Sequence, residues 1–231
     1  MKNKGRFSHL VVLSALAVLL LAGCAEKGPI LLSNIGYQQP AEKKTAAEKK
    51  IVIGVSLFKD SRGLATSVLG TRTIPSGMRN DLVVQGTVAE LVAAALKDAL
   101  KARGLDVKDV PVWDLTAEGM KAEGVDYLFG GEIKVLRLES TGTILSTNLT
   151  ALAQFRIVVG DPIEKKIIRT LDVNSKIEQQ ILYSNERLEE ALSEALTTAL
   201  DQIFQDEVLK SRLQLHKGTV PATAPTSTSG S

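Results

Sequence analysis

The spacing of apolar residues divides the middle of the chain into strands and two main helices. Residues 51–58 are apolar on both faces, which predicts a central strand. Residues 125–139, 147–160 and 166–179 each alternate apolar and polar side chains, as strands covered on one side do. Short connections that contain Gly, Ser, Thr, Asp and Pro separate these three segments, which predicts antiparallel hairpins.

The same alternation predicts which side chains of the three later strands face the core. They are Tyr127, Phe129, Ile133 and Val135 in the first, Leu149, Ala151, Ala153, Phe155, Ile157 and Val159 in the second, and Ile167, Leu171, Val173 and Ile177 in the third. The opposite positions are mostly polar, so we expect a sheet covered on one face and hydrated on the other.

Two segments have helical periodicity. The first begins at Thr87, which forms a capping-box pattern with Glu90, and ends at Gly104. Its apolar stripe comprises Val88, Leu91, Val92, Ala95, Leu96, Ala99 and Leu100. The second helix is predicted over about 184–211, with a stripe of leucine, alanine, isoleucine, phenylalanine and valine.

Shorter elements complete the predicted fold. Glycine and proline interrupt residues 59–86, which predicts a loop or an irregular hairpin. Residues 110–113 suit a short strand, and 115–122 suit a small helix capped by Asp114. The order strand, helix, three strands, helix predicts an α+β two-layer sandwich. It would contain a mainly antiparallel sheet of about four strands, with two main helices on one face.

The first 23 residues have the pattern of a signal peptide. Lys2, Lys4 and Arg6 precede an apolar run over residues 10–21, which is short for a membrane-spanning helix. The run ends in Leu21, Ala22 and Gly23, directly before Cys24.

These last four residues resemble the lipobox of bacterial lipoproteins. The resemblance implies cleavage before Cys24, which then carries a diacylglycerol and usually a further acyl chain such as palmitate. A plain signal peptide with a chance cysteine is the alternative. Two or three acyl chains anchor a protein durably, so a membrane is the first expected partner. Ala25 stands where Asp would retain a lipoprotein in the inner membrane, which resembles an address in the cell outer membrane, facing the periplasm.

Polar segments flank the predicted domain. Residues 24–50 are expected to be the lipidated cysteine and a flexible tether, followed by a periplasmic domain over 51–213. Residues 214–231 are rich in Thr, Ala, Pro and Ser and are expected to be a disordered tail. Within the tether, Ile30-Leu31-Leu32 is an apolar patch that docks on the domain or on lipid, or has no role.

Composition excludes most enzymatic chemistry. The chain has two histidines, His9 and His216, and one cysteine, and none of them lies in the predicted domain. A Ser-His-Asp triad, a Cys-His pair and a His- or Cys-ligated zinc site are therefore impossible there, and no cofactor or metal is expected. Without the signal peptide, 25 basic and 26 acidic residues give a net charge of −1, which argues against nucleic acid as a partner.

The layout resembles the YajG-like family of bacterial envelope lipoproteins. After the lipobox and tether, a strand leads into Phe58-Lys59-Asp60-Ser61-Arg62, a helix ends in Ala102-Arg103-Gly104, and a strand begins with Gly124-Val125-Asp126-Tyr127. Auxiliary lipoproteins of lipid-exporting ABC transport systems look similar in layout. The resemblance covers about 21–210 and implies no catalytic residues.

A candidate partner surface lies in the segment 59–86. It comprises Asp60, Arg62, Val68, Leu69, Ile74 and Met78. An Asp and an Arg one residue apart at a strand end can hold a charged ligand group or pair with each other. The aliphatic residues can form a partner or membrane surface, or they can fold over a sheet edge and complete the core.

Carboxylates at Asp126, Glu132 and Glu139 lie on or beside one predicted strand, and paired carboxylates are used in glycoside hydrolysis. An ordinary solvated strand face explains these carboxylates without catalysis, and Ser61 has only Lys59 nearby as a base. We therefore expect a protein that is not an enzyme.

Two functional hypotheses follow. The first is a non-enzymatic, lipid-anchored binding or adaptor module with an envelope protein as its partner. The alternative is a lipid or apolar-ligand binding accessory subunit of an envelope transport system. That alternative needs an apolar cavity, lined by residues such as Leu96, Phe129 and Phe155.

Overall fold

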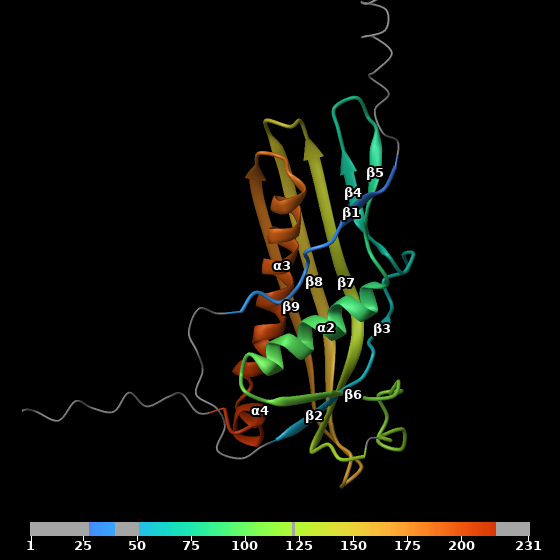
Figure 1. Cartoon of the computed structure of the whole chain (residues 1–231), viewed down its shortest axis with the longest axis vertical. Coiled ribbons are helices and arrows are strands. Elements are labelled where there is room, and N and C mark those ends of the chain that lie inside the picture. The colour runs from blue at the N-terminus through green and yellow to red at the C-terminus, as the bar shows by residue number, and fades with distance from the viewer. Residues whose placement is uncertain (1–27, 40–50, 122, 216–231) are drawn as a thin grey trace, which may run out of the picture.

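Three long antiparallel strands form the centre of the molecule (Figure 1). The computed structural model describes residues 28–39, 51–121 and 123–215. The three long strands are β7 (Tyr127–Gly142), β8 (Thr147–Asp161) and β9 (Lys166–Ile181). They confirm the two predicted hairpins and extend each strand by one to three residues where the alternating pattern had ended.

Short strands flank the free side of β7. Three of them follow one another along it, all parallel to it: β2 (Val52–Val55), β3 (Lys59–Asp60) and β4 (Val68–Thr73). Outside these lie β6 (Asp106–Asp109), β5 (Arg79–Val84) and β1 (Ile30–Leu32). The sheet therefore has nine strands and mixed direction, which corrects the expectation of about four mainly antiparallel strands. Strands of two to six residues are too short to show a sequence period.

Two helices cover one face of this sheet, as predicted (Figure 1). The first, α2 (Val88–Lys101), begins with the expected capping box, because Thr87 accepts the N–H of Glu90 and the Glu90 side chain accepts the N–H of Thr87. The hydrogen bond from the Thr87 hydroxyl lowers the pKa of Glu90, which keeps that cap ionised.

The predicted second helix is interrupted. It consists of α3 (Asn185–Asp201), the 3-10 turn η1 (Gln202–Gln205) and α4 (Glu207–Arg212). Asp206 begins α4 by accepting the N–H of Leu209, and it also binds Arg169 of β9. An N-capping aspartate has extended backbone, so the long helix has to break at that residue.

The core lies between the sheet and the two helices. All six apolar side chains predicted for β8 are at most 2% exposed, so that strand face is confirmed. In β7 the prediction fails beyond Ile133, because the pairing with β8 shifts by one residue between Ile133 and Val135. A bulge of this kind reverses the faces, so Leu136 and Leu138 are buried and Val135 is only half-buried.

A smaller apolar cluster lies on the other face of the sheet, at the end where β7 begins. It consists of Trp113, Met120, Leu128 and Val158, with Ile167 packed against it. Three expectations for this part of the chain are wrong. Ile167 does not lie on the same face of the sheet as Val173. Residues 110–113 come after strand β6 and do not form a strand, and residues 115–121 form turns and not a helix.

Candidate functional site

The first described segment lies across the helical face of the sheet like a strap (Figure 1). We call residues 28–39 the strap. Its strand β1 pairs in parallel with β5, with Ile30 opposite Leu82. Beyond β1 the strap runs along α3, where four of its backbone N–H groups donate to side chains. Ser33 (2.6 Å) and Asn34 (3.1 Å) donate to Glu189, Gly36 donates to Ser193 (3.2 Å), and Gln38 donates to Thr197 (2.9 Å). The Ile30-Leu31-Leu32 patch thus docks on the domain, and this part of the expected tether belongs to the fold.

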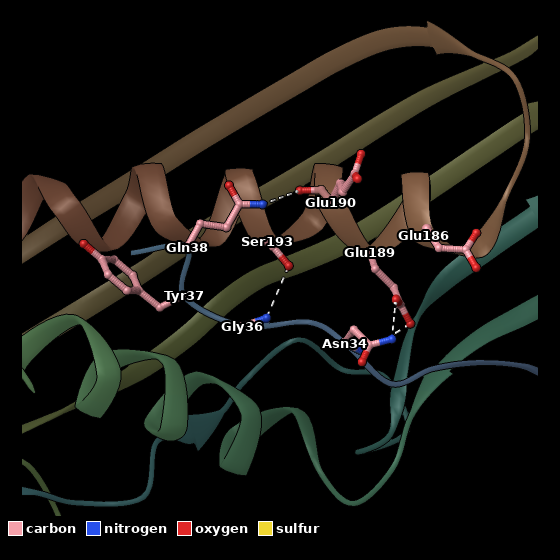
Figure 2. A pocket seen from close by; sticks show the side chains of 8 residues that line it. All are labelled: Asn34, Gly36, Tyr37, Gln38, Glu186, Glu189, Glu190 and Ser193. Carbon is pink, nitrogen blue, oxygen red and sulfur yellow. Dashed lines mark hydrogen bonds between the residues drawn. The ribbon is translucent and has the colours of Figure 1, made fainter. Parts of the chain in front are cut away.

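The three acceptors on α3 form one row because they are spaced by four residues. Glu189 and Ser193 are 6% and 4% exposed, so they lie within the packed side of the helix. A buried carboxylate needs donors, and Glu189 has three, from the N–H groups of Ser33 and Asn34 and from the Asn34 side chain (Figure 2). In the sequence, the signal for this contact was the row of polar residues at every fourth position beside the apolar stripe of the helix.

The far end of the strap joins both helices through a charged cluster. The Arg103 guanidinium, just after α2, donates to Tyr37 Oη (2.9 Å) and to Asp201 Oδ1 (2.6 Å), and it stacks on Phe204 at 3.5 Å. Tyr37 Oη donates in turn to Asp201 Oδ1 at 2.7 Å. Burial and this hydrogen bond raise the pKa of Tyr37, although Arg103 opposes the shift.

A depression of about 330 Å³ lies between the strap and α3 (Figure 2). Its lining comprises Asn34, Gly36, Tyr37, Gln38, Glu186, Glu189, Glu190 and Ser193. Most of these polar groups already bond to one another across the seam, as the dashed lines in Figure 2 show for three pairs. Within the described ranges no group of three or more His, Cys, Asp or Glu side chains is placed to hold a metal ion. The depression is therefore a structural seam.

Asp60 and Arg62, two residues of the candidate surface, pair with each other. The Arg62 guanidinium binds both carboxylate oxygens of Asp60, at 2.9 and 2.8 Å, and also reaches the carbonyl of Val68 at 2.6 Å. The Arg62 side chain is 2% exposed. The hydrogen bond from Arg62 lowers the pKa of Asp60. The pair fixes the loop after β3 to the sheet and leaves little of either charge for a ligand.

The four aliphatic residues of the candidate surface separate in the structure. Leu69 is fully buried, so it belongs to the core and not to a partner surface. Val68 is half-buried beside it in β4. Ile74 and Met78 close the hairpin between β4 and β5, where the N–H of Ile74 donates to the carbonyl of Met78 at 3.1 Å. Only these last two lie at an end of the sheet, and both are half-buried.

A more exposed apolar surface lies at that same end of the sheet, which we call the apolar tip: Ile144, Leu145 and Leu182. Their side chains are 68%, 80% and 69% exposed. Ile144 and Leu145 form the turn from β7 to β8, and the N–H of Tyr183, after Leu182, donates to the Ile144 carbonyl at 2.9 Å. Sequence analysis missed this surface. The signal was a pair of aliphatic residues inside a turn that is otherwise Gly, Thr and Ser.

Arg72 brings a positive charge next to the tip. Its guanidinium carbon lies 3.4 Å from the centre of the Tyr183 ring, and its Nε is buried without a hydrogen-bond partner. None of the carboxylates in the described ranges lies within ion-pair distance of it. The exposed Arg79 lies on the neighbouring strand β5, where its guanidinium donates to the Thr71 hydroxyl. Among the described residues, this end of the molecule therefore combines exposed aliphatic groups with two arginines that form no ion pair.

The carboxylates considered for catalysis are engaged elsewhere. Glu132 accepts hydrogen bonds from Lys134 and from Ser61, and these contacts lower the pKa of Glu132. A general acid needs a raised pKa, so the environment of Glu132 opposes the glycosidase interpretation. Asp126 accepts the N–H of Val52, and Glu139 pairs with Arg137 on the same strand.

Cys24 and the lipobox residues Leu21, Ala22 and Gly23 lie outside the described residues, as do most of the expected tether and tail. In the part of the chain that the structure describes, no helix has the length and hydropathy needed to cross a membrane.

The sequence model of the LptE family, described as lipopolysaccharide-assembly, matches residues 73–206, which is more than half of the chain. These residues run from the end of β4 through the hairpin, both main helices and the three long strands. Fold and match together define a bacterial envelope lipoprotein of the α+β class. The chain belongs to the LptE family, which is non-enzymatic. Among curated proteins, none matches this chain.

Several solved structures are similar to this chain at low sequence identity, and one of them, with a TM-score above 0.5, shows its fold. The protein XCC0632 from Xanthomonas campestris is 7% identical with a TM-score of 0.51, over 80% of this chain and 98% of that one. Lipoprotein GNA1162 from Neisseria meningitidis is 13% identical (TM-score 0.34, 68% and 99% covered). Rare lipoprotein B from Shewanella oneidensis is also 13% identical (TM-score 0.33, 71% and 99% covered). The family match supports the envelope lipoprotein layout, while the YajG-like family in particular is not named by the comparisons.

Proposed function

We propose that this protein is a lipid-anchored accessory subunit of a lipopolysaccharide-assembly system in the outer membrane, and that it acts by binding. Membership of a lipopolysaccharide-assembly family supports the process. The proposal favours the transport-system hypothesis over a general adaptor, although an assembly protein of the outer membrane remains its expected protein partner.

The observation that carries the proposal is the apolar tip beside Arg72. Lipopolysaccharide is an amphiphile with acyl chains and phosphate groups, so its binding site needs exposed aliphatic side chains next to unpaired cations. The tip offers Ile144, Leu145 and Leu182, and Arg72 and Arg79 supply the charge.

A lipid site inside the fold has less support. The residues expected to line such a cavity, Leu96, Phe129 and Phe155, are at most 1% exposed and belong to one continuous core. A core packed at the density of organic crystals has no room for acyl chains. We therefore place lipid binding on the surface and not between the sheet and the helices.

A titration of the purified lipidated protein in detergent with lipopolysaccharide tests the proposal. Replacing Leu145 by Asp removes a large aliphatic contact and should weaken binding at least about tenfold. Ile163→Asp is the matched control, because Ile163 is also 80% exposed but lies in the turn at the opposite end of β8.

A second variant tests whether the positive charge of Arg72 is needed for lipopolysaccharide binding. Arg72→Met keeps most of the hydrocarbon stem and removes the guanidinium that carries the charge, so it should weaken binding of phosphorylated lipopolysaccharide more than of the dephosphorylated form. Equal affinities for wild type, Leu145→Asp and Ile163→Asp would refute the tip as the lipid site. A protein crosslinked at the tip in cells, without lipopolysaccharide, would restore the adaptor hypothesis.

A further inference from the structure

We infer that the strap orients the whole domain, so that the apolar tip rests on the phospholipid surface of the membrane that holds Cys24. This goes beyond lipopolysaccharide binding, because it concerns the bilayer itself and needs no assembly partner. It takes the acyl anchor from the lipobox pattern and adds a fixed direction for the folded part.

The beginning of the strap is held at the tip end of the sheet. The Gly28 carbonyl accepts a hydrogen bond from the Asn80 side chain at 2.8 Å, and β1 then pairs with β5. Asn80 lies opposite Arg72 in β4, and Arg72 lies opposite Ser140 in β7. Gly28 is therefore level with Ser140, three residues before the turn at Thr143 begins, which is a distance of about 10 Å along the strand.

The chain outside the structure is too short to let the other end reach the membrane. Four residues lead from Cys24 to Gly28, and they span at most about 14 Å when extended. The turn at Ile163 lies at the far end of β8, a strand of 15 residues, and thus about 45 Å from the tip. Figure 1 shows the β7–β8 turn and the β4–β5 hairpin at one end of the molecule and the β8–β9 turn at the other.

The strap cannot swing away without losing its contacts. Glu189, Ser193 and Thr197 hold its middle, and the Tyr37, Arg103 and Asp201 cluster holds its end. A free tether of 26 residues would instead allow any orientation. With the strap docked, four residues of the sequence lead from Cys24 to Gly28.

Surface chemistry selects the tip over the sides of the domain. Ile144, Leu145 and Leu182 can enter the interface between headgroups and acyl chains, where aliphatic side chains are favoured. The open face of the sheet carries ion pairs such as Arg156–Asp172 and Lys176–Glu178, which favour water. Arg79 at the tip end suits the anionic headgroups of bacterial phospholipids.

Fluorescence quenching in vesicles tests the orientation. Because Cys24 is the chain's single cysteine and is acylated, a cysteine introduced at position 145 or 163 is the one free thiol for a polarity-sensitive label. The full lipidated protein is reconstituted in phosphatidylethanolamine and phosphatidylglycerol vesicles that contain brominated acyl chains. Both positions are 80% exposed turns, so each label leaves the core intact, which circular dichroism checks.

The label at 145 should lose most of its emission and shift to the blue, whereas the label at 163 should behave as it does in water. Quenching at neither position, or at both, would overturn the inference. The vesicles contain no lipopolysaccharide, so failure here leaves the proposed function standing, and a failed lipopolysaccharide titration leaves the orientation standing.

Discussion

The backbone N–H of Ser33 lies 2.6 Å from Oε1 of Glu189, a carboxylate that is only 6% exposed. The two residues are 156 positions apart, so this contact joins the beginning of the described chain to the last main helix. It makes the segment after the expected lipid anchor a part of the folded domain. Only four residues of the sequence lead from Cys24, the expected lipid anchor, to Gly28 at the start of the strap.

Removing this acceptor should loosen the strap. In Glu189→Ala, three donors of Ser33 and Asn34 lose their partner, which costs about 1–3 kcal/mol of the free energy of unfolding. Hydrogen–deuterium exchange should accelerate in residues 30–38, while urea denaturation reports the loss of stability.

The matched control is Glu194→Ala on the exposed side of the same helix. It should leave both the exchange of the strap and the urea midpoint close to wild type. Unchanged strap exchange in Glu189→Ala would show that the strap is held without this carboxylate.

Gly70, the one glycine of β4, lies in close contact with the backbone of β7. A Cβ atom there would lie 2.0 Å from the carbonyl oxygen of Leu138, and the φ angle of +156° already disfavours a side chain. Gly70→Ala should therefore lower the free energy of unfolding by about 2 kcal/mol or more. Gly36→Ala, where a Cβ meets nothing within 4 Å, should change it little. Equal thermal midpoints for the two variants would contradict this close approach.

Tyr37 makes part of the domain's free energy of unfolding depend on pH in the alkaline range. Its pKa is raised by burial and by the hydrogen bond to Asp201, so the folded protein keeps the phenolic proton after the unfolded chain has lost it. The contribution is complete below the unfolded pKa of about 10 and is lost as pH rises further. Urea denaturation between pH 8 and 11, values chosen to bracket about 10, should show a smaller decline for Tyr37→Phe than for wild type. Parallel declines would mean that Tyr37 titrates alike in both states.

Asp60 makes part of the free energy of unfolding depend on pH in the acidic range. Arg62 lowers its pKa, so the stability from their pairing is present above the unfolded value of about 3.9 and disappears as pH falls. Asp60→Asn should reduce stability at neutral pH and flatten the loss of stability between about pH 5 and 2. Glu194→Gln, at an exposed position, is the control and should follow the wild-type curve.

Cys24→Ser should release the protein from membranes, because it removes the expected site of acylation. Fractionation after a high-salt wash measures this, and the released protein should keep the circular dichroism of the wild type. A variant that still sediments with membranes would refute the lipid anchor.

Long periodic elements and the buried strand β2 could be predicted from the sequence, whereas most of the other short elements could not. The faces of β8 and the capping box of α2 followed from local spacing alone. The bulge after Ile133 depends on pairing with β8, and β3 has only two residues, so neither leaves a local signature. The break before α4 depends on Asp206, which caps the helix and binds Arg169 of a distant strand.

For the candidate site, too, the sequence showed some features and only the structure showed the others. Asp60 and Arg62 were correctly singled out as neighbours, but only the structure shows that they satisfy each other. The sequence left Leu69 either in a partner surface or in the core, and the pairing of β4 with β7 buries it in the core. Docking of Ile30-Leu31-Leu32 on the domain was one of the alternatives, but the contacts of residues 33–38 were missed because their partners on α3 lie more than 150 residues away.

Site-specific photo-crosslinking in the bacterium that encodes this protein tests the central claim most directly. A photoreactive amino acid replaces Leu145 in one strain and Ile163 in another, two side chains of equal exposure at opposite ends of the sheet. We predict that irradiation joins lipopolysaccharide to the protein at position 145 and not at position 163. Comparable crosslinks at both positions, or none to lipopolysaccharide at 145 while other envelope components are captured there, would contradict a lipopolysaccharide-binding tip.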